Sequence, residues 1–155
     1  MMNMLQNQVK LGIINPSDLS KGNVTGGSTG FVRNILPYLN VKRVVIFGIG
    51  LKNTVPWKTY HLSANVDFVP ICNLRFPSKI PMRLKVLLYY IRHRKQILNS
   101  GVDVLYVQMP ECCLPFLNNR KTIPVIYQKH GSANPVAKSK FFFGRNILFR
   151  KFSSY

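Results

Sequence analysis

The strongest constraint on the fold of this chain is a set of short, largely apolar segments, at least one of which is apolar without alternation. The clearest example is Arg43–Ile49, with the sequence RVVIFGI. Further segments of this kind are Lys10–Asn15, Val102–Gln108 and Ile123–Gln128. A strand that is apolar on both faces belongs in a sheet covered on both faces, which is typical of parallel sheets flanked by helices. Val66–Ile71 predicts a shorter strand, and Pro70 makes it a candidate edge strand.

Segments with helical spacing lie between these predicted strands. One helix is expected to bury Phe31, Val32, Ile35, Leu36 and Leu39, with Pro37 disturbing its last turn. A longer helix from Pro77 to about Leu98 is expected to bury Leu84, Leu87, Leu88, Ile91 and Leu98. Glu111–Asn119 predicts a short helix, Phe141–Tyr155 the start of another, and Leu51–Ala64 a loop. Because such crossovers join parallel strands, the sequence predicts an α/β fold with a Rossmann-like doubly wound parallel sheet and helices on both faces.

In such a sheet, ligands bind beyond the carboxyl ends of the strands, where the strand order reverses. The cluster Gly26-Gly27-Ser28-Thr29-Gly30 lies between the first strand and a helix. Glycines allow close approach of the backbone to a ligand, and the helix start offers unpaired N–H groups, with Ser28 or Thr29 as a possible cap. The alternative is a surface loop, since the spacing matches neither the dinucleotide fingerprint nor the P-loop.

Other polar residues follow later strands and are expected at the same edge. Gln108 and Glu111 follow one strand, and His130 and Gly131 follow the next. His130 could contact a ligand or simply be a hydrogen-bonded strand-end residue. For Glu111, a position at the start of a helix, where a carboxylate is favourable, is preferred over a ligand contact.

The charge balance limits the partners of the chain. Its 155 residues contain 22 Lys and Arg but only 4 Asp and Glu, for a formal charge of +18. Such a chain attracts polyanions, or else is a fragment whose acidic part lies elsewhere. The segment Lys138–Tyr155 mixes basic and aromatic residues, which suits an anionic membrane surface. The alternatives are a helix that docks on a further domain, or a solvated charged face. Cys72, Cys112 and Cys113 fit neither a disulfide framework nor zinc spacing, which indicates reduced packing residues.

Several segments together resemble the N-terminal domain of GT-B glycosyltransferases, specifically the retaining family-four group. These segments are Leu11–Ile14, Gly26-Gly27 with the helix Phe31–Leu39, Asp103–Gln108, and Pro124–Gly131. The resemblance implies a lead-in over residues 1–9 and an acceptor-side domain over residues 10–155. It also implies that the donor-binding domain, with its pair of glutamates, is absent from this chain. The chain is therefore expected to be truncated and inactive alone.

The resemblance also implies a function. A hexosyltransferase of this type moves a sugar from a nucleotide-diphosphate sugar to a glycan or lipid-linked acceptor, as in polysaccharide biosynthesis, without a metal or further cofactor. The implied catalytic residue is His130. The implied substrate-binding residues are Gly26, Gly27, Ser28, Gly30, Gln108, Glu111 and Gly131. Gln108 stands where family members often have a histidine. The expected location is cytoplasmic, peripheral at the inner face of the membrane through Lys138–Tyr155, with no nucleic-acid partner.

Two other functions compete with this interpretation. The first is a non-enzymatic basic module that binds an anionic membrane or nucleic acid, although no recognised nucleic-acid motif is present. The second is a small Rossmann oxidoreductase, which needs an acid about 20 residues past the glycines. No acid lies between Asp18 and Asp67, which argues against it.

Overall fold

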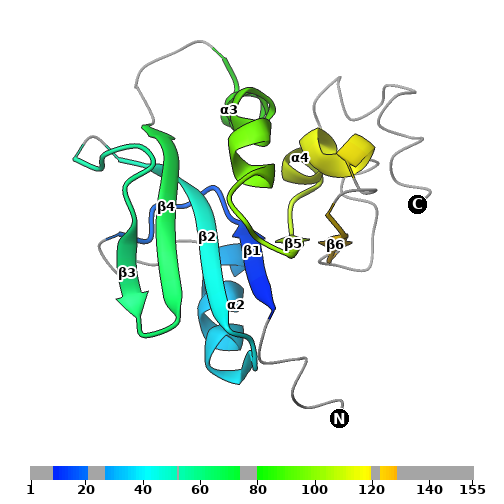
Figure 1. Ribbon diagram of the computed structural model, residues 1–155. Coiled ribbons are helices and arrows are strands. Elements are labelled where there is room, and N and C mark those ends of the chain that lie inside the picture. Colours follow the sequence, from blue (N-terminus) through cyan, green and yellow to red (C-terminus); the bar gives the residue numbers. More distant parts are fainter. Residues whose placement is uncertain (1–8, 21–26, 52, 74–79, 120–122, 129–155) are drawn as a thin grey trace.

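The computed structural model describes residues 9–20, 27–51, 53–73, 80–119 and 123–128, which form a six-stranded sheet with helices (Figure 1). The strands are β1 (Lys10–Ile14), β2 (Arg43–Gly50), β3 (Tyr60–Ser63), β4 (Val66–Asn73), β5 (Val104–Val107) and β6 (Val125–Tyr127). The helices are α2 (Gly27–Ile35), α3 (Met82–Leu98) and α4 (Pro110–Cys113), and 3-10 turns follow at Leu36–Tyr38 and Leu114–Asn119.

The strand order in the sheet is β3-β4-β2-β1-β5-β6, and all neighbours are parallel except the antiparallel pair β3 and β4. From β1 the chain first adds strands on one side and then returns through α3 to add β5 and β6 on the other. The α/β doubly wound sheet predicted from the sequence is therefore confirmed.

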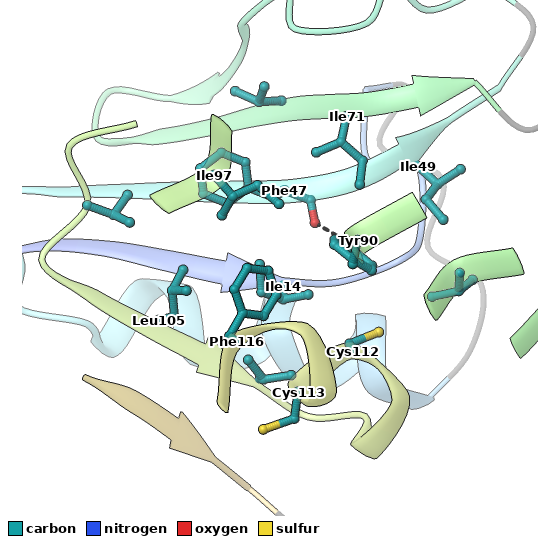
Figure 2. Packing of buried hydrophobic residues seen from close by; sticks show 14 of the residues in the cluster. Ile14, Phe47, Ile49, Ile71, Tyr90, Ile97, Leu105, Cys112, Cys113 and Phe116 are labelled. Atoms are coloured by element: carbon teal, nitrogen blue, oxygen red, sulfur yellow. Dashed lines mark hydrogen bonds between the residues drawn. The ribbon is translucent and has the colours of Figure 1, made fainter. Parts of the chain in front are cut away.

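The face of the sheet under α3 and α4 carries the larger part of the core (Figure 2). Tyr90 of α3 is completely buried, and its hydroxyl donates a hydrogen bond of 2.9 Å to the backbone carbonyl of Phe47 in β2. Its ring also meets the ring of Phe116 edge-on, with centroids 6.4 Å apart. These contacts fix α3 against the middle of the sheet.

The opposite face is covered by α2. Val32 of α2 packs there with Ile13, Ile46 and Phe68 from three adjacent strands. Leu36 and Leu39, beyond the end of α2, are partly buried against the same cluster. The predicted disturbance at Pro37 is confirmed, because the helix changes to a 3-10 turn at Leu36.

The orientation predicted for α3 was wrong. Of the five residues expected to face the core, Leu84, Leu88 and Ile91 are exposed, Leu87 is half-buried, and Leu98 packs against the core as predicted. The face that packs on the sheet instead carries Lys85, Val86, Tyr90 and Ile97. The helix thus has two apolar stripes, and the sheet selects the one that includes the hydrogen-bonding tyrosine.

The predicted loop Leu51–Ala64 also needs correction, because it contains strand β3. β4 is consequently not the edge strand. The pairing of β4 with β3 nevertheless ends at Phe68. Pro70 lies beyond that β3–β4 pairing, so its lack of an N–H group breaks no hydrogen bond to β3. The carbonyl of Pro70 accepts a hydrogen bond of 2.7 Å from the backbone N–H of Trp57.

The cysteines behave as the sequence indicated. Cys112 and Cys113 are buried members of the core under α3, and no disulfide is formed. Burial raises the pKa of the Cys113 thiol to about 11. Burial, followed by the nearby carboxylate of Glu111, also raises the pKa of Cys112. These thiols therefore stay protonated at neutral pH and serve as packing groups.

Candidate functional site at the carboxyl edge of the sheet

The strand order reverses between β1 and β5, which lie side by side with Ile14 opposite Val107. The next residues, Asn15 and Gln108, are therefore neighbours at the carboxyl edge, and both are buried polar residues. Side chains alternate along a strand. Ile13 and Tyr106 contribute to the cluster under α2, so Asn15 and Gln108 also project toward the α2 face.

The loop after β1 is held in place by its own polar side chains. Asn15 Oδ1 accepts a hydrogen bond of 3.0 Å from the backbone N–H of Ser17. Ser17 Oγ and the fully buried Thr29 Oγ1 share a hydrogen bond of 2.7 Å, which joins the loop to the first turn of α2. A side chain on Gly48 would come within 2.5 Å of the carbonyl oxygen of Ser17, so only glycine lets the loop lie directly over β2.

Asp18 ties the same loop to the end of β2. Its Oδ2 accepts a hydrogen bond of 2.6 Å from the backbone N–H of Leu51. Its Oδ1 accepts hydrogen bonds from both the backbone N–H and the hydroxyl of Ser20. Residues 15–20 of the β1–α2 connection are therefore held in one position at the carboxyl edge of the sheet.

The helix α2 begins at Gly27, earlier than the predicted caps. Thr29 lies within the first turn and bonds to Ser17, so the prediction that it caps the helix was wrong. The N-terminal end of α2, with Gly27 and Gly30 in its first turn, therefore lies at this edge. A Cβ on Gly30 would meet no described atom within 4 Å. The packing of the described residues thus does not require glycine there.

Gln108 is held by a chain of hydrogen bonds across β5 and β6. The hydroxyl of Tyr106 donates to Oε1 of Gln128, the residue directly after β6, and accepts a hydrogen bond of 3.2 Å from Nε2 of Gln108. In this arrangement the amide nitrogen of Gln108 is the donor to the hydroxyl of Tyr106. The carbonyl oxygen of Gln108 is then turned away from Tyr106.

That carbonyl oxygen is the unusual feature of the site. Gln108 is 5% exposed, and its Oε1 is buried with no hydrogen-bond partner among the described residues. A buried acceptor without a partner is costly, about 1 to 3 kcal/mol, and is uncommon in native proteins. A water molecule, or a ligand hydroxyl that gained access to this buried atom, would satisfy it.

Glu111 belongs to the other face of the sheet. It lies in the first turn of α4, as preferred from the sequence, and its Oε1 is 3.4 Å from Nε of Arg83 at the start of α3. The two side chains form an ion pair without a hydrogen bond, because Oε1 has no hydrogen-bond partner among the described residues. Glu111 thus lies at the same carboxyl edge as Gln108, but on the face of the sheet that α3 covers rather than on the face that α2 covers.

The structure therefore describes part of the predicted site. Gly27 and Gly30 lie in the first turn of α2, and Gln108 lies at the same edge and face. Gly26, His130 and Gly131 lie outside the described residues, as does the basic segment Lys138–Tyr155. Sequence reasoning missed Asn15, Ser17, Tyr106 and Gln128. For Asn15 and Gln128 a signal existed, since each is a polar residue directly after an apolar strand.

The described residues lack two kinds of feature. They contain no group of three His, Cys, Asp or Glu side chains placed to hold a metal ion. Among them, no helix has both the length and the apolar character needed to cross a membrane.

The fold is that of a Rossmann-like domain and is glycosyltransferase-like. The chain is similar in structure to sucrose-phosphate synthase from Thermosynechococcus elongatus, with a TM-score of 0.63 and 14% identity. That alignment covers 95% of this chain and 39% of the synthase chain. A second structure of the synthase has a TM-score of 0.51 and 12% identity, covering 79% of this chain and 64% of that chain. No protein-family model and no curated protein sequence matches the chain. At these identities the likeness establishes the fold alone.

Proposed function

We propose that this chain forms the acceptor-side domain of a nucleotide-sugar glycosyltransferase of the retaining family-four type. The glycosyltransferase-like fold supports this proposal, and the observation that carries it is the unpartnered carbonyl oxygen of Gln108 at the strand reversal. A sugar is a ligand rich in hydroxyl donors, which is what a buried, fixed acceptor requires.

The reaction is the transfer of a sugar to a glycan or lipid-linked acceptor. The acceptor hydroxyl oxygen bonds to the anomeric carbon, the bond from that carbon to the phosphate oxygen breaks, the nucleoside diphosphate leaves, and the hydroxyl proton is released. In this scheme Gln108 accepts a hydrogen bond from a sugar hydroxyl, and Tyr106 and Gln128 hold its amide in the required orientation.

The start of α2 suits the charged part of the donor. Backbone N–H groups and the positive end of a helix favour an anion, so we assign the diphosphate to the residues Gly26, Gly27, Ser28 and Gly30. His130 and Gly131 follow β6 in the sequence and are proposed to orient the transferred sugar. In the proposed enzyme a second, donor-binding domain completes the site.

The experiment that tests this proposal is a titration of the whole chain with UDP-glucose and GDP-mannose, followed by ligand-observed NMR. The variant Gln108→Leu keeps the size of the side chain and removes the acceptor. We expect it to weaken binding about threefold to tenfold, the value of one hydrogen bond. The matched control, Gln96→Leu, changes an exposed glutamine on α3 and should bind as the wild type does. The proposal fails if the wild type shows no contact with either sugar nucleotide at millimolar concentration, or if both variants lose binding equally.

A further inference from the structure

The exposed side of α3 carries a row of aliphatic side chains that the fold leaves uncovered. Leu84, Leu88 and Ile91 are 44%, 48% and 47% exposed. Residues three and four apart share one face of a helix, so these three form a continuous stripe. The stripe lies opposite the face that packs on the sheet, which carries Val86, Tyr90 and Ile97. A contiguous row of exposed aliphatic side chains on a helix indicates a surface for interaction with a protein or a membrane.

Cations surround this stripe. Lys95 continues it four residues after Ile91, and Arg92 lies on one flank, both exposed, while Arg94 lies partly buried on the other flank. The sequence from residue 80 to residue 102 contains no acidic residue. We call the stripe and these three cations the α3 surface.

We propose that the α3 surface docks on a lipid bilayer with anionic headgroups. Helices that lie in a membrane interface combine an aliphatic face, which enters the boundary of the acyl chains, with Lys and Arg at the level of the headgroups. The long stems of Arg92 and Lys95 can follow the apolar stripe while their charges remain at the headgroups. An anionic surface complements both the local cations and the +18 charge of the chain.

Other occupants fit the same residues less well. A second copy of this chain packed through the same surface would bring Arg92 and Lys95 close to their own copies, which is unfavourable. A nucleic acid would use the cations but gain little from three aliphatic side chains, because it is recognised through phosphates, base edges and aromatic stacking.

This inference does not depend on the proposed sugar transfer. It does have a geometric consequence if both hold. The helix α3 follows the carboxyl end of β4, so its first turn lies at the same edge of the sheet as Gln108. Docking through α3 would bring that edge to the membrane, where a lipid-linked acceptor resides.

Sedimentation with vesicles tests the proposal. The whole chain is mixed with phosphatidylcholine vesicles that contain either no anionic lipid or one-third phosphatidylglycerol. We expect binding to the anionic vesicles only. The double variant Arg92→Gln/Lys95→Gln should weaken it about 25-fold, because each cation near such a surface contributes about fivefold. The double variant Leu88→Gln/Ile91→Gln should weaken it to a similar extent, since each half-buried aliphatic side chain contributes roughly fivefold.

Two control variants carry matched changes outside the α3 surface. Ile126→Gln alters a side chain of β6 that is 53% exposed, and Lys42→Gln removes an exposed cation before β2. Both should retain most of the binding. All variants change exposed or nearly exposed side chains, and urea unfolding checks that each is folded.

Several outcomes would overturn the proposal. Equal binding to neutral vesicles, or no binding to anionic ones, would do so. So would α3 variants that bind as well as the controls, because the cations elsewhere in the chain would then be sufficient. A wild-type dimer that Leu88→Gln/Ile91→Gln converts to a monomer would make the surface a contact between copies. Loss of oligonucleotide binding, without loss of vesicle binding, in Arg92→Gln/Lys95→Gln would make it a nucleic-acid surface.

Discussion

Replacing Gly30 with alanine should make the protein more stable and the proposed site weaker. Gly30 lies in the first turn of α2, has a negative φ, and has no described atom within 4 Å of the place a Cβ would occupy. Glycine inside a helix costs about 0.5 to 1 kcal/mol relative to alanine. The free energy of unfolding should therefore rise by up to about 1 kcal/mol, which corresponds to a rise in Tm of about 2 to 4 °C per kcal/mol for a chain of this size.

The effect on binding should have the opposite sign. If the open space beside Gly30 admits the diphosphate of the donor, a methyl group there should weaken UDP-glucose binding by about 1 kcal/mol or more, the usual cost of overpacking. Urea unfolding measures the first quantity and ligand-observed NMR the second. The control Asn34→Ala, at an exposed position later in α2, should stabilise the helix without affecting binding.

The result that would refute this reasoning is specific. A loss of stability in Gly30→Ala would mean that the fold itself requires the glycine. Higher stability with unchanged UDP-glucose binding would mean that the space beside Gly30 is solvent, and the diphosphate would have to be placed elsewhere.

Two further predictions concern the core. Tyr90→Phe should lower the free energy of unfolding by only about 0.5 to 1.5 kcal/mol, because the carbonyl of Phe47 keeps a second hydrogen bond of 3.1 Å from the backbone N–H of Asn15. Tyr89→Phe, on the half-buried side of the same helix, is the control, and a loss above about 3 kcal/mol in Tyr90→Phe would contradict the two-donor geometry. The pKa of Cys113 is raised to about 11 in the folded protein, so the folded state holds this proton more tightly than the unfolded state. Stability should therefore fall as the pH rises from about 9 to 11, and urea unfolding of Cys113→Ala across that range should show a shallower fall.

The central strands of the sheet could be predicted from local sequence patterns. Arg43–Gly50 is apolar on both faces, and in the structure it is indeed an interior strand with buried neighbours on each side. The strand β3 could not be predicted, because Tyr60–Ser63 is short and mostly exposed. It pairs with β4 as a local hairpin across residues 64 and 65, but its mostly exposed side chains leave no apolar signal in the sequence.

The sequence indicated where the candidate site lies in the sheet, but only some of the residues that form it. That Gln108 follows a strand is visible in the sequence, and the strand order then places it at the reversal. Its unpartnered carbonyl is not visible, because it depends on Tyr106 and Gln128 meeting across two strands. Hydrogen bonds between separate strands follow from register, which only the assembled sheet fixes.

The sequence by itself determined the class of fold, the strands that form its centre, and the glycine cluster at the start of α2. These features follow from periodicity and backbone preference, which act over a few residues. The tertiary structure alone decided which side of α3 faces the sheet. Both of its apolar stripes satisfy the helical period, so burial of Tyr90 against the carbonyl of Phe47 selects one and leaves Leu84, Leu88 and Ile91 outside.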